Sequence, residues 1–435
     1  MSSVPVQPCS RMIPWWKRAP AALLQACFRR SGRLRRLADV AHGLAHPLSD
    51  YERYYRAYMG ELFDVVAATD PRDASLRDYN ARHRGERQAQ SRGPRTLAIV
   101  LPDITGSTSG GQRTVFRIAR HWLDRGHRVH LYINLFSYTR DPDRMRAYIR
   151  EHYGDERGLE VHLDTRAIGE SDILMATGWE TAYTVFRQPN TRFKAYLVQD
   201  YEPWFSPMSA PALFAENTYR MNLFGCFSSP WLARMGREQF GMDGLQFHYG
   251  YDEAHYGPAP ATPRDPDLVA VYLRPTTARR GFELMKYALR RLKEQRPRTR
   301  IAIFGSSERI DGLGFEAEQL GALDDRCLAG LYRRAAVVTV ASLTNYSIIP
   351  VEAMACGALV VDVDRPSVAS IFTHGEDILL APVHPQAIAE TLRAALDDAT
   401  LRSRITTEAG ARLARFRWPE ILAGLERDLL DAYCA

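Results

Sequence analysis

The sequence predicts an α/β protein with two doubly wound parallel sheets in tandem. Short apolar runs alternate with helical segments in both halves of the chain, as in parallel sheets. Four prolines between residues 250 and 266 separate the two series in the manner of a linker. The 435 residues also exceed one ordinary core and suit two domains with added segments.

The first series begins after residue 93. Arg95–Leu101 is an apolar run that predicts a buried strand, and the glycine-rich turn Gly106–Gly111 follows it. A helix over Thr114–Arg125 and a strand over Val129–Leu135 come next. Further strands are expected at 172–176 and 195–199. We therefore assign the first Rossmann-like domain to residues 94–255.

The second series opens with a strand at Leu268–Leu273, a helix at Ala278–Glu294 and a strand at Arg300–Phe304. The later elements are helices at 328–335, 349–355 and 385–398 and strands at 336–340 and 358–363. They define a second domain over 256–415. The residues 416–435 form an amphipathic helix that is expected to return to the first domain.

An appended region covers residues 1–93, and it holds the basic charge of the chain. Residues 1–40 carry eight bases and one acid, while the rest carries 49 bases and 50 acids. A neutral body argues against nucleic-acid binding, which needs a basic face on the fold. The tail either contacts anionic lipid through Trp15 and Trp16 or is a solvated arm. Residues 51–66 are expected to be helical, and 70–93 to be a polar linker.

The cellular location is expected to be the cytoplasm, at the inner face of the membrane if the tail binds lipid. No apolar run approaches the ~20 residues that span a bilayer, and no signal peptide is predicted. The cysteines form no CxxC pair and no cluster with zinc spacing, so they are read as free thiols of a reducing compartment. They are Cys9, Cys27, Cys226, Cys327, Cys356 and Cys434.

The run Ser342–Gly357 carries the first chemical signal. A strand is expected to end just before it, with Ser347 as the N-cap of a helix and Pro350 in its first turn. Free N–H groups and the helix dipole at this end suit a diphosphate. Glu352 in the same turn can accept hydrogen bonds from a ribose. The alternative is a carboxylate that only favours the dipole.

Two arginines are expected at the same cleft. Arg274 directly follows a strand and Arg280 opens a helix. Guanidinium groups at such junctions offset charge on a leaving diphosphate. Arg279 is expected at the surface.

The spacing of these residues resembles the donor half of GT-B glycosyltransferases of retaining family 4. The resemblance extends from about Arg95 to the end of the chain. It implies two Rossmann-like domains that face across a cleft, with a nucleotide sugar between them and no metal or other cofactor. Arg274 and Arg280 take the basic positions, Glu352 takes that of the ribose-binding glutamate, and Thr344 replaces a glutamate that contacts the transferred sugar in relatives. The motif residues are Arg274, Arg280-Gly281, Gly305, Glu352 and Ala355-Cys356-Gly357.

Four motifs resemble the WsaF-type rhamnosyltransferases of bacterial surface-glycan assembly. They are Leu343–Pro350, Val198–Pro207, Ala215–Arg220 and the donor loop Arg274–Leu284. The resemblance implies dTDP-L-rhamnose as donor and a growing glycan, such as a lipid-linked O-antigen chain, as acceptor. A 6-deoxy sugar offers fewer polar groups, which is compatible with Thr344.

The predicted site therefore combines three groups of residues. The catalytic group is Arg274, Arg280 and Glu352. The donor-binding group is Gly110, Gly111, Gly305, Ser306, Thr344, Asn345, Tyr346, Ser347 and Ile348. The acceptor or sugar contacts are Gln199, Asp200 and Glu202, although Asp200 could instead cap a turn.

No metal site is predicted, because Asp362-Val-Asp364 is one of several Asp-x-Asp strings in the chain. The glycine turn lacks the Lys-Ser/Thr of a P-loop and the GxGxxG fingerprint of a dehydrogenase. The functional prediction is a retaining rhamnosyl transfer. The alternatives are a GT-B hexosyltransferase that uses a UDP- or GDP-sugar and a non-catalytic subunit that binds glycan or lipid.

Overall fold

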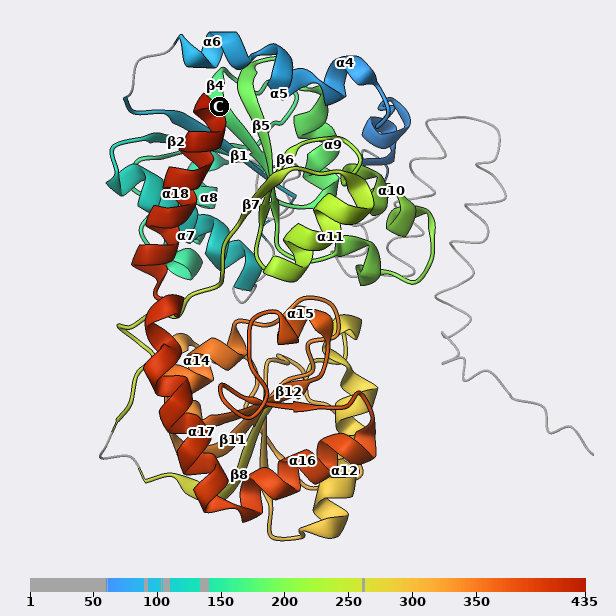
Figure 1. Cartoon of the computed structure of the whole chain (residues 1–435), viewed down its shortest axis with the longest axis vertical. Helices are drawn as coiled ribbons and strands as arrows, with labels where there is room; N and C mark the ends of the chain where they lie inside the picture. The colour runs from blue at the N-terminus through green and yellow to red at the C-terminus, as the bar shows by residue number, and fades with distance from the viewer. Residues whose placement is uncertain are drawn as a thin grey trace, which may run out of the picture. The chain divides into compact units, whose positions relative to one another are not determined.

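The computed structural model describes residues 60, 62–89, 93–102, 104, 110–133, 141–259 and 263–435. The basic tail, most of the helix expected at 51–66 and residues 106–109 of the glycine turn lie outside these residues. Figure 1 shows two sheets, each flanked by helices. Among the described residues, no helix combines the length and apolarity needed to cross a bilayer.

The first sheet has seven parallel strands in the order β3-β2-β1-β4-β5-β6-β7. All six residues of β1 and of β4 are buried, as expected for central strands covered on both faces. The strand order reverses between β1 and β4, and such a switch point opens a crevice at the carboxyl ends. The bounds are β1 Thr96–Leu101, β2 Arg128–Ile133, β3 Leu159–His162, β4 Ser171–Ala176, β5 Thr191–Val198, β6 Phe224–Phe227 and β7 Gly244–Gln246.

The second sheet has six parallel strands in the order β10-β9-β8-β11-β12-β13. Its order reverses between β8 and β11, which gives a second crevice. The predicted class, two doubly wound domains, is thereby confirmed. The bounds are β8 Asp265–Tyr272, β9 Arg300–Phe304, β10 Glu318–Gln319, β11 Ala335–Thr339, β12 Leu359–Val363 and β13 Leu379–Ala381.

The helices of the first domain include α7, which begins at Gly110 and not at Thr114 as expected. The Thr114 hydroxyl donates to the Gly110 carbonyl over 3.1 Å, so the last two residues of the glycine turn belong to the helix. The bounds are α7 Gly110–Asp124, α8 Pro142–Tyr153, α9 Trp179–Arg187, α10 Ala210–Thr218, α11 Pro230–Phe240 and the 3-10 helix η1 Glu202–Phe205.

In the second domain, the helix expected at 278–294 is broken at Gly281. This glycine has φ +57°, a left-handed conformation that ends the 3-10 turn η2 and starts α12. The bounds are η2 Ala278–Arg280, α12 Phe282–Gln295, α13 Asp325–Arg334, α14 Ile349–Ala355, α15 Pro366–Ala369, α16 Pro385–Asp397, α17 Ala399–Arg412, η3 Leu413–Phe416 and α18 Trp418–Cys434.

The linker expected at 70–93 is wrong for residues 74–88, which form α4 Ala74–Arg77, α5 Tyr79–Arg82 and α6 Arg84–Gln88. The Tyr79 hydroxyl donates to the carbonyls of Pro189 and Thr191, each over 2.7 Å. The side-chain amide of Asn80 exchanges two hydrogen bonds with the backbone of Lys194. These bonds fix the segment to β5, which polarity alone does not predict.

The helix α18 packs on elements of the first domain, among them α6, α7 and β7. The carboxylate of Glu426 accepts hydrogen bonds from His121 over 2.8 Å and from His127 over 3.0 Å. The Tyr433 hydroxyl lies 3.2 Å from a carboxylate oxygen of Asp172. The last helix is therefore a structural part of the first domain.

Candidate active site

A cavity of about 440 Å³ is lined by residues of both Rossmann-like domains. The first domain contributes the start of α7, the residues after β5 and the start of α9. The second contributes the residues after β8, the end of β9 and the start of α14. All of these lie at the carboxyl ends of parallel strands, where doubly wound sheets bind ligands.

Most of the predicted site residues line this one cavity. The exceptions are Ser306, Thr344 and Asn345, so the expected direct donor contacts of these three are not supported by the geometry. The predicted residues that do line it are Gly110, Gly111, Gln199, Asp200, Glu202, Arg274, Arg280, Gly305, Tyr346, Ser347, Ile348 and Glu352.

The three exceptions make other contacts. The Ser306 hydroxyl donates to the carbonyl of Glu308. Asn345 is 1% exposed, and its amide donates to the Gln199 carbonyl and to the Ser228 hydroxyl, both over 2.9 Å. Thr344 is also buried, and its hydroxyl donates to a carboxylate oxygen of Asp200 over 2.8 Å. Asn345 and Thr344 therefore hold first-domain residues of the cavity wall in place.

Asp200 uses its two carboxylate oxygens for different partners. One accepts from the backbone N–H of Tyr201 over 2.8 Å, which is the turn-capping role expected as the alternative. The other accepts from Thr344 and lies 3.7 Å from the guanidinium of Arg279. Burial raises the pKa of Asp200, while Arg279 and Arg280 act to lower it. The capping and cleft roles are thus compatible.

Arg279 was expected at the surface, and this expectation is wrong. Its guanidinium lines the cavity and stacks 4.3 Å from the ring centre of Phe205. Burial, together with the neighbouring Arg280, lowers its pKa. The break at Gly281 takes Arg279 out of the helix, so helical spacing does not decide which way its side chain points.

Arg280 is connected to the end of β12. One of its nitrogens lies 3.4 Å from the Ser342 hydroxyl, and the Ser342 backbone N–H donates to Asp362 over 2.9 Å. Asp362 also accepts from the N–H of Val363, and burial raises its pKa to about 6. The first acid of the Asp-x-Asp string therefore supports the loop that faces Arg280.

Close packing of glycines shapes two walls of the cavity. The side-chain amide of Gln199 donates to the Gly111 carbonyl over 3.2 Å, and a Cβ on Gly111 would lie 3.3 Å from that amide nitrogen. Gly305 has φ +99°, and a Cβ there would collide with the Tyr272 ring. Both glycines keep backbone close to the space that a ligand would fill.

Glu352 lies in the first turn of α14, at 8% exposure. Burial, as the largest cause, and the nearby carboxylate of Asp325 together raise its pKa to about 8. The helix has seven residues and its N-cap position is Ile348, not Ser347 as expected. The Ser347 hydroxyl still accepts a hydrogen bond of 3.3 Å from the N–H of Ile349.

Sequence reasoning missed several polar residues of the cavity wall, among them Arg113, Glu180, Tyr256 and Asp325. Arg113 on α7 forms an ion pair with Asp325 on α13, and the Tyr256 hydroxyl donates to the same carboxylate over 3.0 Å. The acidic pair that opens α13 was the available signal, but the helix was expected to start only at residue 328.

Glu180 forms a carboxyl pair with Glu202. A Glu202 oxygen accepts from the backbone N–H of Trp179 and from the Tyr196 hydroxyl. Burial raises the pKa of Glu180 to about 7, and burial together with Glu180 raises that of Glu202. The raised pKa of both groups favours their neutral carboxyl forms, which can donate as well as accept hydrogen bonds.

Comparison with protein families shows what the second domain resembles. Residues 259–412 match the family described as glycosyl transferases group 1. The match covers most of the second domain and less than half of the chain, and we call the matched residues, 259–412, the group 1 domain. The matched residues of this group 1 domain include Arg274, Arg280 and Glu352, together with the whole second sheet.

Relatives extend the likeness beyond the group 1 domain. The chain is 32% identical over 335 residues to the O-antigen biosynthesis protein RfbC of Myxococcus xanthus. The aligned region covers 75% of this chain and 26% of that protein. It is 28% identical over 222 residues to a phosphatidyl-myo-inositol mannosyltransferase of Mycolicibacterium smegmatis, and this aligned region covers 48% of this chain and 58% of that protein. The chain thus spans about a quarter of the first relative and just over half of the second.

Among solved structures, the chain resembles Alr3699/HepE of Anabaena in complex with UDP-glucose. The TM-score is 0.60 at 16% identity, and the superposition covers 78% of this chain and 100% of that one. This likeness establishes the GT-B fold for the two sheets, with the group 1 domain as its second half.

Proposed function

We propose that this protein is a retaining glycosyltransferase that transfers L-rhamnose from dTDP-L-rhamnose to a growing bacterial surface glycan. One observation carries the proposal. Arg274, Arg280 and Glu352 line the same cavity, at the carboxyl ends of the strands of a group 1 glycosyltransferase domain. The wall opposite is polar and belongs to a second Rossmann-like domain, so a donor and an acceptor have separate surfaces to bind.

In this proposal the donor binds with its ribose at Glu352 and its diphosphate beside Arg274 and Arg280. A buried carboxyl group suits two vicinal ribose hydroxyls, since it both accepts and, when protonated, donates hydrogen bonds. Two guanidinium groups suit a diphosphate because each offers several N–H donors in a fixed plane.

The chemical step is a substitution at the anomeric carbon on the face from which the diphosphate departs. The acceptor oxygen bonds to this carbon as the bond from carbon to the phosphate oxygen breaks. The acceptor hydroxyl proton passes to the departing phosphate oxygen, so no protein base is required. Arg274 and Arg280 stabilise the negative charge that develops on the leaving group.

Further observations concern the sugar and the acceptor. Thr344 replaces a glutamate of the resembling family and donates its hydroxyl to Asp200. The carboxylate in this part of the site is therefore that of Asp200. The similarity to an O-antigen biosynthesis protein supports a surface glycan as acceptor. We place the reaction at the cytoplasmic face of the membrane, with residues 1–40 as the contact to anionic lipid.

The test has two steps. Melting temperatures are measured with dTDP, UDP and GDP, since the preferred nucleotide stabilises the native state most. The protein is then incubated with dTDP-L-rhamnose and a rhamnose-terminated acceptor, and the anomeric configuration of the product is read by NMR. An α-linked rhamnoside is expected if the configuration of a β-linked donor is inverted, and a β-linked one if it is retained; only the second outcome supports a retaining enzyme.

A second candidate is a hexosyltransferase that uses a UDP- or GDP-sugar. The similarity to a mannosyltransferase and to a structure solved with UDP-glucose favours it. A shift with UDP or GDP but none with dTDP would replace rhamnose by a hexose and keep glycosyl transfer. Absence of any nucleotide shift would instead favour a subunit that binds glycan or lipid without catalysis.

A further inference from the structure

Three ligand-type side chains gather on the outer strands of the first sheet, away from the cavity. His130 lies on β2, and Glu160 and His162 lie on the edge strand β3. In the parallel register, His130 is opposite Glu160 and Tyr132 is opposite His162. Because side chains two residues apart on a strand share a face, the three groups emerge on one side of the sheet.

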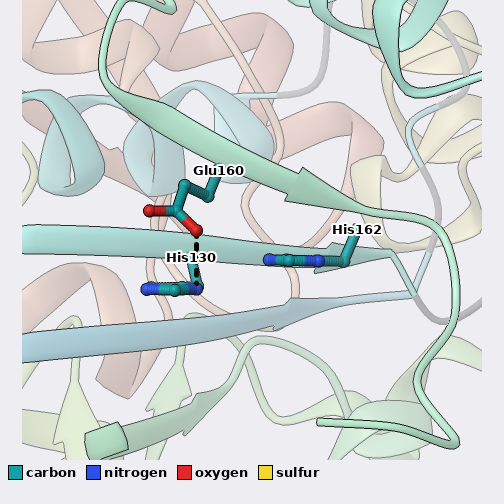
Figure 2. Close-up of side chains that lie close together, drawn as sticks. All are labelled: His130, Glu160 and His162. Atoms are coloured by element: carbon teal, nitrogen blue, oxygen red, sulfur yellow. Dashed lines mark ion pairs between the residues drawn. The ribbon is translucent and has the colours of Figure 1, made fainter. Parts of the chain in front are cut away.

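The geometry brings one ligand atom of each residue to within 4.8 Å of the others. Nδ1 of His130 lies 3.4 Å from a Glu160 oxygen, and the two imidazole rings are nearly parallel with centres 5.6 Å apart. Figure 2 shows the ring of His162 pointing toward the pair formed by His130 and Glu160.

The ring of His162 is held in place by its neighbour. It stacks on Tyr132 with centres 4.5 Å apart, and the Tyr132 hydroxyl accepts from the N–H of Gly169 over 3.0 Å. The Nε2 atom of His162 is buried and has no hydrogen-bond partner among the described residues. A buried imidazole nitrogen normally has a partner, so this atom calls for a ligand outside the protein.

Two imidazoles and one carboxylate are a ligand set that zinc favours. Zinc binds such nitrogen and oxygen atoms at about 2.0–2.2 Å, often as three protein ligands with a water in the fourth position. The side chain of Glu160 is 59% exposed and free to close the remaining distance. We propose that His130, Glu160 and His162 bind a divalent transition metal, with Zn²⁺ as the best fit.

This metal is separate from the proposed glycosyl transfer. None of the three residues lines the cavity, so the prediction of metal-independent chemistry there is unaffected. The ion would connect β3, a four-residue edge strand, to β2. An ion that binds only the folded chain stabilises it, so the melting temperature rises as the metal occupies the site.

The test titrates Zn²⁺ into the chelator-treated full-length protein by calorimetry and measures the melting temperature with and without Zn²⁺. His162→Phe removes both ring nitrogens and keeps an aromatic ring against Tyr132. The matched control is His255→Ala, which removes a histidine 3.4 Å from Asp252. That pair lies outside the cluster of three ligands.

The native protein and the His255→Ala variant are expected to bind one Zn²⁺ and to melt a few degrees higher with it. His162→Phe should lose at least about tenfold in affinity, since even residues behind the ligands have effects of that size. If this variant does not fold, Glu160→Gln on the exposed side serves instead. Unchanged affinity in the folded variant, or no saturable Zn²⁺ binding by the native protein, would overturn the proposal.

Discussion

Glu352 shows how burial changes the chemistry of one residue. Its side chain is 8% exposed, and burial raises its pKa to about 8. The guanidinium groups of Arg117 and Arg113 act in the opposite direction and favour the carboxylate. At neutral pH the group thus retains a proton, which suits a hydroxyl-rich ligand more than a cation.

The raised pKa predicts a pH-dependent effect of Glu352→Gln. The native state binds this proton up to about pH 8, whereas the unfolded chain releases it near pH 4.5. The native protein therefore loses stability as pH rises through this window, and glutamine does not. The melting temperature of the variant minus that of the native protein should increase from pH 5 to pH 9.

Differential scanning fluorimetry across this pH range measures the effect. The control is Glu283→Gln, which changes an exposed side chain of α12. A difference in melting temperature that stays constant with pH would contradict a buried, protonated Glu352.

Arg280→Ala should lower kcat by roughly 10²–10³, the loss seen when one donor to a developing negative charge is removed. The native folding of the variant is checked by its melting temperature. The matched control is Arg290→Ala, an exposed arginine on α12 that pairs with Glu294. Steady-state kinetics with the nucleotide sugar that gives the largest thermal shift measures both. Equal kcat values for the two variants would remove Arg280 from the mechanism.

Arg279→Ala tests whether Arg279 acts in the cavity, where the structure has it, or lies at the surface, as the sequence predicted. A surface arginine leaves kcat/KM unchanged on truncation, whereas one that faces Asp200 in the cavity does not. We expect a loss of about tenfold or more in kcat/KM, since removing it also leaves a buried carboxylate without its cation. A kcat/KM equal to that of Arg290→Ala would show that Arg279 has no role in the cavity.

At the scale of elements, central strands and long helices were predictable because burial gives them a visible pattern. β9 and α14 were expected with the bounds that the structure has. The short strands β3, β6, β7, β10 and β13 were missed, since they have two to four residues and too few apolar positions to show a period.

Gly281 marks an element boundary that the sequence did not reveal. A glycine within a helical pattern is tolerated, so the pattern continued through it. Tertiary packing decides otherwise: a Cβ here would lie 3.1 Å from Ala341 and 3.2 Å from Leu343. The left-handed turn presents Arg279 and Arg280 to the cavity before α12 begins.

Gly281→Ala is therefore expected to destabilise the protein by about 1–3 kcal/mol, because alanine is strained at positive φ. The matched control is Gly330→Ala within α13, where a Cβ meets no atom of the described structure within 4 Å. The higher helix propensity of alanine should stabilise this control variant by up to about 1 kcal/mol. Urea unfolding measures both, and a neutral Gly281→Ala would show that the turn is not strained by a side chain.

At the scale of the whole molecule, the site combines residues that are far apart in sequence. The ion pair from Arg113 to Asp325 joins positions 212 residues apart, and Thr344 bonds Asp200 across 144. Local patterns identified Arg274, Arg280 and Glu352 because each follows a strand or opens a helix. They could not identify partners across the cavity, since those depend on how two domains meet.

Glu426→Gln tests the attachment of α18 to the first domain. Burial acts to raise the pKa of Glu426, but the hydrogen bonds from His127 and His121 lower it overall. The charge therefore stabilises the fold above pH 4.5, and this contribution is lost as pH falls through the lowered pKa. We expect the variant to lose about 1–3 kcal/mol at neutral pH and less in acid. An equal loss at both pH values would show that the charge is not involved.

The position of α18 also affects the order in which the chain folds during synthesis. Domains commonly fold as they leave the ribosome, first domain first. Here the partners of Glu426 and Tyr433 are made some 260 to 300 residues earlier, at Asp172, His121 and His127. The first sheet thus waits for the second domain to be translated before its own last helix arrives, and a nascent chain halted before residue 418 would leave that face uncovered to chaperones and proteases.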